Sequence, residues 1–493
     1  MHPSKLTEEL PLTRMWVDGR ETAAESGDTI DIFNPSTRKA FAKVPRAKET
    51  DVNGAVAAAA RAFRSWRHCS AKERADALFK IADRLQSESE AIADVLATET
   101  GNAIRTAARP ETAGAAGIFR YYAGVAGEAK GETIPVAEGR LSYTVREPLG
   151  VVAAIIPWNS PVAAAAVKVA SAIAMANTIV VKTAEDAPLS ALKLSAICNE
   201  FLPPGVVNCI TGYGNECGVY LTRHADVKKI SFTGSTETGK AIMRAAAEKI
   251  IPVSLELGGK SPSIVFPSAN SDWAVEGVVT AMRFTRQSQS CTAGSRLFIH
   301  RDIYDEFLHK LAAKLDRFIV GDPLNESTDM GALINERQYK KVNDYIRCGL
   351  AEPSAELLTG GPSPQEGRLG QGYFALPTLI SGVENSWRVA REEIFGPVLV
   401  AIPWSDERQM LEMANDTHYG LAAYIWTTEL GEAMRCSAAI DAGWIQVNNG
   451  NAPGAGISFG GMKASGFGRE FSLEGMIESF TQRKSVTLDF TNA

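Results

Sequence analysis

Residues 150–156 read Gly-Val-Val-Ala-Ala-Ile-Ile, an unbroken apolar run that decides the fold class of this chain. Such a run is typical of a strand in a parallel sheet that is covered on both faces. Helical and strand patterns alternate along the chain after it. Helices are expected at 161–176, 187–202, 216–224 and 237–247, and strands at 178–181, 206–210 and 229–233. This alternation predicts a doubly wound α/β domain whose ligand lies at the carboxyl ends of the strands.

The chain before this domain is expected to be mostly helical. Short strands at 15–17 and 29–33 come first. Three amphipathic helices should follow: one capped by Asp51 and ending near Trp66, one running from a capping box at 70–73 to about Gly101, and one at 111–128.

A second α/β region begins near Ser261. Its strands are expected at 263–266, 297–300 and 398–402, its helices at 303–318, 336–349 and 406–415, and a surface loop at 353–372. Two further segments, 141–145 and 484–490, alternate between apolar and polar residues and predict half-exposed strands. The second lies at the C-terminus, where an exposed strand edge invites pairing, for example with another subunit.

Length and charge limit the function classes. A chain of 493 residues exceeds the roughly 250–300 residues at which a single core stops growing, so two or three domains are expected. The net charge of −6 argues against a nucleic-acid partner, which would require a basic face. The most apolar stretch, 162–181, is broken by Lys168, so no membrane span is predicted. The N-terminus also lacks the apolar segment of a secretory signal.

The cysteines and histidines show neither a disulfide pattern nor a metal-binding pattern. Seven cysteines, an odd number without CxxC spacing, indicate a reduced, cytoplasmic protein. The six histidines form no cluster of ligand spacing, so no metal site is predicted.

Two stretches predict a nucleophile and a base. Cys291 lies in QSQSCTAGSR (287–296), among small and polar neighbours that leave its sulfur accessible, whereas a structural cysteine usually lies among aliphatic residues. Glu256 lies between two leucines and is followed by Gly258 and Gly259. Apolar surroundings raise the pKa of a carboxyl and suit it to accepting a proton near neutral pH.

Polar side chains follow two of the expected strands. Asn159, in PWNSP (157–161), offers an amide donor that could stabilise an oxyanion, although a capped turn would have the same sequence. Lys182 and Glu185 end the next strand, where an acid can bind a ribose and repel a 2′-phosphate, which favours NAD over NADP. The alternative is an ordinary surface pair.

Two more stretches have the features of a nucleotide site. Gly234 and Ser235 begin a helix after a strand, where free N–H groups and the helix dipole favour phosphate. No GxGxxG follows any strand, so a helix cap without a ligand is the alternative. Glu393 and Phe395 precede another strand and could contact a sugar diol and a flat ring, unless this is a solvated acidic loop.

Together these stretches resemble the aldehyde dehydrogenase superfamily, of the hydrolytic, NAD(P)-dependent type. The resemblance extends from about Trp16 to Val486. It depends on an ordered series of motifs: PWNSP (157–161), KTAE (182–185), FTGSTETG (232–239), LELGGKSP (255–262), QSCTAGSR (289–296), EEIFGPVL (392–399) and FGGMKASGFGRE (459–470).

The resemblance implies a covalent mechanism for the oxidation of a small-molecule aldehyde. Cys291 would attack the aldehyde carbon as a thiolate and form a thiohemiacetal. Asn159 and the backbone N–H of Cys291 would form the oxyanion hole. Hydride transfer to the nicotinamide would leave a thioester, which water activated by Glu256 would hydrolyse. Lys168 also matches a family lysine near the site.

The resemblance further implies the cofactor contacts. Lys182 and Glu185 would bind the adenosine ribose of NAD, with NADP left open as a second cofactor. Trp158 and Ser235, with Gly234 beside it, would contact the pyrophosphate. The nicotinamide ribose and ring would lie against Glu393 and Phe395.

The family fold implies three structural units. Residues 1–130 and 150–256 would form the NAD-binding domain, 257–470 the catalytic domain, and 131–149 with 471–493 an oligomerisation arm. A homodimer or homotetramer is therefore expected.

Several positions depart from the family pattern. Thr183 replaces the usual proline and leaves the fine cofactor preference open, and Ser288 replaces a glycine that many relatives carry. Five positions that are often bulky in relatives for small aldehydes carry smaller residues here, which implies a wider entrance for a bulky or aromatic aldehyde: Ser160, Ala164, Val167, Gly450 and Pro453. Arg283 and Arg286 are candidate anchors for a substrate carboxylate.

The alternatives to a hydrolytic dehydrogenase are a CoA-acylating relative, a cysteine hydrolase and a non-catalytic protein of the same fold. A CoA-acylating relative generally lacks the glutamate found here as Glu256. A cysteine hydrolase without redox chemistry usually pairs its thiol with a histidine, and neither His224 nor His300 stands out for that role. A non-catalytic protein of the same fold would not require Cys291, Glu256 and Asn159 together.

Overall fold

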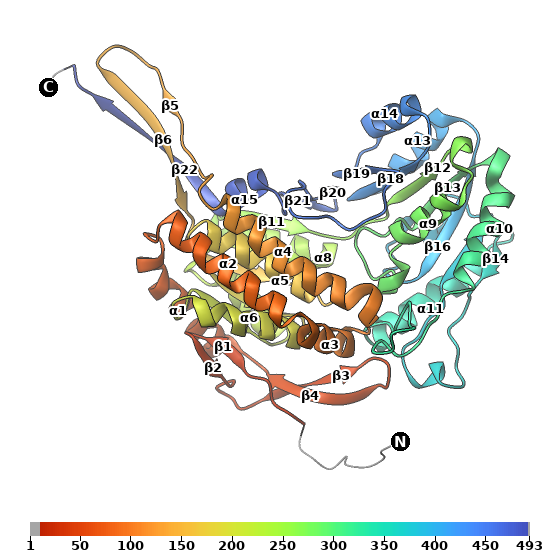
Figure 1. Ribbon diagram of the computed structural model, residues 1–493, viewed down its shortest axis with the longest axis horizontal. Coiled ribbons are helices and arrows are strands. Elements are labelled where there is room, and N and C mark those ends of the chain that lie inside the picture. The colour runs from red at the N-terminus through yellow and green to blue at the C-terminus, as the bar shows by residue number, and fades with distance from the viewer. Residues whose placement is uncertain (1–9, 492–493) are drawn as a thin grey trace.

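Two large sheets dominate the computed structural model, which describes residues 10–491 (Figure 1). The strands of the first are β1 (Met15–Val17), β2 (Arg20–Thr22), β7 (Val151–Ile155), β8 (Thr178–Lys182), β9 (Val207–Ile210), β10 (Val227–Thr233), β11 (Val253–Glu256) and β21 (Gly466–Phe467). Their order is β2-β1-β9-β8-β7-β10-β11-β21, and β9, β8, β7, β10 and β11 are parallel. This is the predicted doubly wound sheet, and its strand order reverses between β7 and β10.

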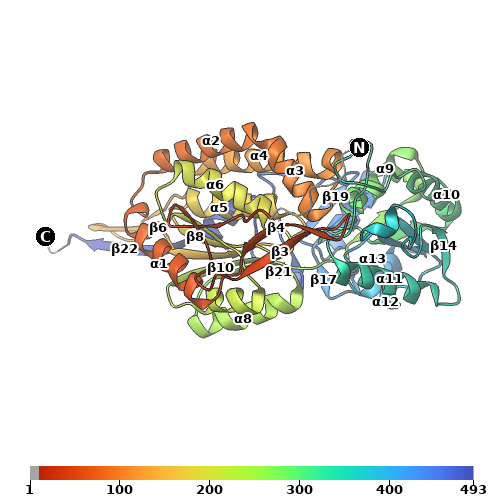
Figure 2. The ribbon, with the colours of Figure 1, turned by 90° about the horizontal axis from the view of Figure 1, so that it is seen from below.

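Helices cover both faces of the first sheet, as Figure 2 shows. On one face lie α2 (Ala71–Ser87), α3 (Ser89–Thr100), α4 (Arg109–Val125), α5 (Pro161–Ala174) and α6 (Leu189–Phe201), and on the other α1 (Glu49–Trp66), α7 (Val219–Arg223) and α8 (Thr236–Lys249). Val152 and Ala154 of β7 pack into the first layer, whereas Val151 and Ala153 pack into the second. The strand is apolar throughout because both of its faces are buried.

Two details of the N-terminal helices differ from expectation. Asp51 is the third residue of α1 rather than its cap, and its carboxylate accepts the N–H of Lys48 at 2.9 Å. The helix expected from 70 to 101 is divided at Glu88, which leaves helical geometry (φ −97°, ψ 5°). The capping box at its start is confirmed, since Ser70 Oγ accepts from Glu73 N at 3.2 Å. A π-helical turn, Ile104–Ala108, precedes α4.

The second sheet contains four strands that the sequence did not predict. Its strands are β12 (Pro262–Val265), β13 (Arg296–His300), β14 (Glu356–Thr359), β15 (Thr378–Ser381), β16 (Val398–Trp404), β18 (Ala422–Trp426) and β19 (Trp444–Val447). Their order is β14-β15-β16-β13-β12-β18-β19. The loop expected at 353–372 is wrong over β14, which pairs with β15. The sequences of the short strands β18 and β19 show no recognisable alternation of apolar and polar residues, so these strands were not predicted.

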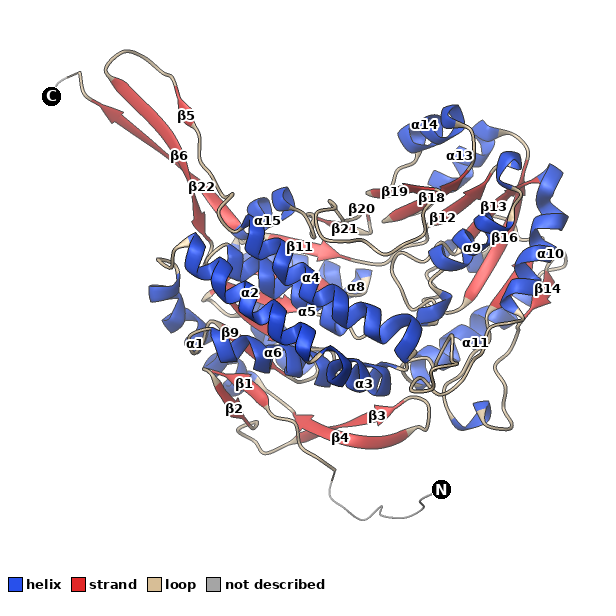
Figure 3. Cartoon of the chain, in the orientation of Figure 1, coloured by secondary structure: helices blue, strands red, loops and turns tan. Residues whose placement is uncertain are grey.

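Helices also cover the second sheet (Figure 3). α9 (Asp272–Ala281) and α10 (Tyr304–Leu315) pack on one face, and α11 (Glu336–Leu350), α13 (Glu407–Asn415) and α14 (Leu430–Ala439) on the other. α12 (Arg388–Arg391) precedes β16, and β17 (Tyr419–Gly420) pairs with β20 (Met462–Lys463). A separate hairpin, β3 (Thr29–Asn34) and β4 (Lys39–Pro45), lies below the helices in Figure 1.

A three-stranded arm extends away from the body of the molecule (Figure 1). It consists of β5 (Thr133–Ile134), β6 (Arg140–Pro148) and β22 (Thr481–Asp489), and α15 (Leu473–Phe480) leads into it. The C-terminal strand that was expected to invite pairing is paired along one edge with β6 of its own chain. Within residues 10–491 there is no helix of the length and apolarity that a membrane crossing requires.

Candidate active site

The candidate residues lie between the strand ends of the two large sheets. Asn159 follows β7 and Ser235 follows β10, so both lie at the carboxyl ends of strands beside the point where the strand order reverses. Glu256 is the last residue of β11. From the second sheet, Cys291 precedes β13 and Glu393 precedes β16. The carboxyl ends of one sheet therefore meet the amino ends of the other.

The turn after Glu256 brings Cys291 and Glu393 together. A side chain at Gly258 would clash with the carboxylate of Glu393, and one at Gly259 would clash with the carbonyl of Cys291. The N–H of Gly259 donates to Glu393 Oε1 at 2.9 Å. Only glycine permits this close approach of three chain segments.

Cys291 is half-buried in the centre of this region. Burial raises the pKa of its thiol to about 12, and the nearby carboxylates of Glu256 and Glu393 act in the same direction. The charge of Arg283 opposes this rise in pKa. Without a ligand the sulfur is therefore a protonated thiol, and its attack on a carbonyl requires removal of that proton.

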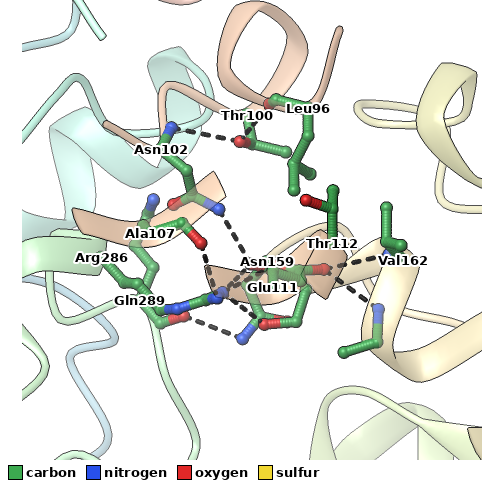
Figure 4. Close-up of polar contacts among 12 residues, drawn as sticks. Leu96, Thr100, Asn102, Ala107, Glu111, Thr112, Asn159, Val162, Arg286 and Gln289 are labelled. Carbon is green, nitrogen blue, oxygen red and sulfur yellow. Dashed lines mark hydrogen bonds and ion pairs between the residues drawn. The ribbon is translucent and has the colours of Figure 1, made fainter. Parts of the chain in front are cut away.

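The amide of Asn159 is held beside the loop that carries Cys291. Its Nδ2 donates to the carbonyl of Gln289 at 2.8 Å, and within residues 10–491 it makes no other hydrogen bond (Figure 4). An amide nitrogen carries two protons, so one N–H remains for another acceptor. Asn159 can thus serve as an oxyanion donor without breaking the bond that orients it.

Glu256 is buried with an unpaired carboxyl. Neither oxygen has a hydrogen-bond partner in the described part of the chain. Burial raises the pKa of this carboxyl well above its usual range, and the charge of Glu470 adds to that rise, whereas Lys168 and Arg469 oppose it. The direction of the pKa shift expected from its leucine neighbours is confirmed. Such a group is suited to accepting a proton.

Lys168 lies on α5, in the interior near Glu256. Its Nζ donates to Glu470 Oε1 at 2.6 Å and to Ser231 Oγ at 2.9 Å, and its side chain is fully buried. Glu470 is the last residue of the motif at 459–470, and nothing in that motif indicated a role for it. The charge of Lys168 thus offsets the negative charge of Glu470, a second buried carboxylate close to Glu256.

Five of the predicted cofactor residues lie at the carboxyl ends of β7, β8 and β10, whereas Glu393 and Phe395 precede β16. Lys182 is buried, and its Nζ lies 3.4 Å from Glu185 Oε2, on a side chain that is 39% exposed. Ser235 caps α8, and its Oγ accepts the N–H of Thr238 at 3.3 Å. The rings of Trp158 and Phe395 meet edge to face with centroids 5.3 Å apart. Across residues 10–491, no group of three histidine, cysteine or acidic side chains could hold a metal ion.

Neither arginine proposed as a carboxylate anchor is free. The Nη atoms of Arg283 donate to the carbonyls of Gly450 and Asn451. Arg286 forms an ion pair with Glu111 at 2.8 Å. Both guanidinium groups are occupied by the protein itself, so the anchor interpretation is wrong for this structure.

Two of the five positions expected to widen the entrance do not do so. A side chain at Gly450 would clash with the backbone of α9 at Gly277 and Ala281, so this glycine serves packing. Val167 is buried in the core. Ser160, Ala164 and Pro453 remain partly exposed.

Comparison with known proteins gives one consistent result. The aldehyde dehydrogenase family matches over residues 22–486. DhaS of Bacillus subtilis (strain 168) is 40% identical over 476 residues, which are 96% of this chain and 95% of that protein. The crystal structure of PnpE in complex with nicotinamide adenine dinucleotide is 38% identical, covers 98% of both chains and has a TM-score of 0.95. The NAD+ complex of aldehyde dehydrogenase from Bacillus cereus is 37% identical, covers 99% of this chain and 98% of that chain, and has a TM-score of 0.94.

Proposed function

This chain belongs to the aldehyde dehydrogenase family, and from that membership we propose how its own residues oxidise an aldehyde to a carboxylic acid with NAD. Three observations carry the proposal: the sulfur of Cys291 is half-buried and feels the charge of Glu256, the amide of Asn159 is bonded to Gln289 two residues before Cys291, and the carboxyl of Glu256 is buried and unpaired. These groups are a nucleophile, an oxyanion donor and a base.

The first step forms a bond to Cys291. The thiol gives up its proton to solvent water, the sulfur attacks the carbonyl carbon, and the π electrons move onto the oxygen. The free N–H of Asn159 and the backbone N–H of Cys291 donate to the resulting oxyanion. These hydrogen bonds lower the barrier to forming the tetrahedral adduct and the barrier to its breakdown. When bound, NAD supplies the acceptor for the hydride that leaves this carbon. The carbonyl then re-forms and remains attached to the sulfur as a thioester.

The second step breaks that bond. Glu256 takes a proton from a water molecule whose oxygen attacks the thioester carbon. The C–S bond breaks, the sulfur leaves as a thiolate, and the acid is released. A carboxyl with a raised pKa performs this task well because its conjugate acid is weak enough to hold the proton.

The residues around the site fit a dinucleotide. The Glu393 carboxylate lies against the glycine turn at Gly258, which supports its proposed role in binding a ribose diol, and α8 begins at Ser235 with N–H groups suited to phosphate. Glu185 is half-exposed beside Lys182, a position from which it can bind the other ribose and repel a 2′-phosphate. We therefore assign NAD as the preferred cofactor.

A substrate panel tests this function. Purified enzyme should form NADH from aldehydes without added CoA, and CoA should not change the rate. We expect aromatic and bulky aldehydes to have a kcat/KM at least about 10-fold above that of acetaldehyde, because the small side chains of Ser160 and Ala164 leave room. NADP should support a kcat/KM about 10-fold lower than NAD. A clear preference for acetaldehyde would contradict the substrate assignment only, whereas failure to reduce NAD with any aldehyde would contradict the function.

The raised pKa values predict the pH dependence. Cys291 and Glu256 act in their deprotonated forms, and both pKa values lie above the usual range for their groups. As the pH falls through these values the groups become protonated, so activity is lost on the acid side. We expect kcat, with aldehyde and NAD both saturating, to rise steadily from about pH 6 to about pH 9, because kcat includes both attack by the sulfur and hydrolysis of the thioester. Initial rates across that range provide the test, and a flat or falling profile would contradict the assignment.

We also propose the arrangement of the units and of the subunits. The first sheet serves as the NAD-binding domain, the second as the catalytic domain, and the arm as an oligomerisation element. Apolar side chains on the arm are exposed, among them Ile134, Leu141, Leu488 and Phe490. An uncovered apolar arm is unusual in a monomer, so a homodimer or homotetramer is proposed, which a monomer mass in light scattering would contradict. All seven cysteines are free, which supports a reducing, cytoplasmic location.

A further inference from the structure

We propose that the ion pair between Arg286 and the buried Glu111 positions the amide of Asn159 for the oxyanion. This inference rests on the proposed role of Asn159 and adds two positioning residues to it. Neither would touch the substrate: both would act through the backbone segment that carries Asn159 and begins α5. Figure 4 shows the pair and the groups around it.

Glu111 caps α5 from a neighbouring helix. It lies in the first turn of α4 with its side chain fully buried, and its Oε1 accepts the N–H of Val162 at 3.0 Å and of Ala163 at 3.1 Å. Ser160, which precedes α5, makes no capping bond of its own. The carboxylate therefore satisfies the free N–H groups of the helix and lies at the positive end of its dipole.

Arg286 joins the other oxygen of that carboxylate to the Asn159 segment. Its Nη1 lies 2.8 Å from Glu111 Oε2, 2.8 Å from Ser160 Oγ and 3.4 Å from the carbonyl of Asn159. Its Nη2 donates to the carbonyl of Ala107 at 3.3 Å. Nη1 has two protons for three acceptors, so one of its N–H groups is shared, and Nη2 reaches the fourth acceptor. The single nitrogen of a lysine would not present this planar pair of donor atoms.

The same arginine is part of the nucleophile loop. It ends the 3-10 turn Phe284–Arg286, five residues before Cys291, and Gln287 after it has left-handed backbone geometry (φ 51°). The side chain of Asn159 is in turn bonded to the carbonyl of Gln289 in this loop. Asn159 is thus held at both its main chain and its side chain by this segment, and Asn102 Nδ2 also donates to its carbonyl at 3.4 Å. The orientation of the remaining N–H of the amide is therefore fixed, as a preorganised oxyanion donor requires.

Double-mutant cycles with Asn159 test the proposal. We expect Arg286→Met to lower kcat/KM for aldehyde about 10²-fold and Arg286→Lys about 10-fold, with the Kd for NAD unchanged. In the Asn159→Ala background, where the amide is already absent, the same substitutions should lower kcat/KM less than about threefold. Glu111→Gln should behave like Arg286→Lys. Arg286→Lys keeps the charge, so it carries the cycle if Arg286→Met does not fold.

Arg74 provides the matched control. It is a half-buried arginine that contacts the opposite end of α5, where its Nε donates to the carbonyl of Ala174 at 2.9 Å. Arg74→Met should lower the melting temperature but change kcat/KM less than about threefold, and equally in both backgrounds.

Two results would overturn the proposal, and only the second of them also contradicts the proposed role of Asn159. If the losses from Arg286 and Asn159 multiply, Arg286 does not act through the amide, although the role of Asn159 stands. If Asn159→Ala alone keeps wild-type kcat/KM, the oxyanion role fails and the positioning role fails with it.

Discussion

Replacing Cys291 with alanine is expected to lower kcat for aldehyde oxidation by about 10⁵-fold, because no other group can form the covalent adduct. The side chain is half-buried among small neighbours, so the loss of one sulfur atom should leave the fold intact. The Kd for NAD should stay within about twofold of wild type, since the predicted cofactor contacts come from other residues. Stopped-flow NADH fluorescence measures the turnover rate, and calorimetry with NAD measures the Kd.

Cys69 is the control for this substitution. It is also half-buried, and its sulfur lies 3.7 Å from Glu73 Oε2 at the start of α2, away from the carboxyl ends of the strands. Cys69→Ala should keep the wild-type kcat. If Cys291→Ala retained more than about a hundredth of wild-type turnover, a thioester at this position would be ruled out.

The sequence predicted the first domain well because burial on both faces leaves a clear pattern. The apolar run at 150–156 became β7, and the alternating segments after it became the parallel strands and helices in the expected order. The residues that follow β7 and β10 could be expected to meet, since carboxyl ends of parallel strands share one edge. Asn159 follows β7 and Ser235 follows β10, so both lie at this edge.

Other features could not be predicted because they depend on contacts between distant segments. Arg286 and Glu111 are 175 positions apart, and nothing in either local sequence indicates the other. Arg286 could therefore be interpreted as a substrate anchor, whereas the structure shows it satisfied by a carboxylate and a hydroxyl of the protein. Gly450 was similarly expected to line an entrance, and its real constraint is the backbone of α9.

Replacing Glu256 with glutamine is expected to separate the two halves of the reaction. The first turnover should still release about one NADH per active subunit, because acylation of Cys291 uses the sulfur and the amide of Asn159. Later turnovers should slow by about 10²–10³-fold, because water then attacks the thioester without a base. The amide of glutamine has nearly the volume of the carboxyl it replaces, so the buried site should not collapse.

The measurement is the ratio of burst rate to steady-state rate in stopped flow at neutral pH. Glu99→Gln is the matched control, since Glu99 is a second buried carboxyl with a pKa raised to about 7 by burial, but it binds the N–H groups of Leu189 and Ser190. That variant should lose thermal stability and keep the wild-type ratio. A Glu256→Gln enzyme with wild-type steady-state rate would show that another group activates the water. A variant without a burst would place Glu256 in the first step instead, as the base that deprotonates Cys291.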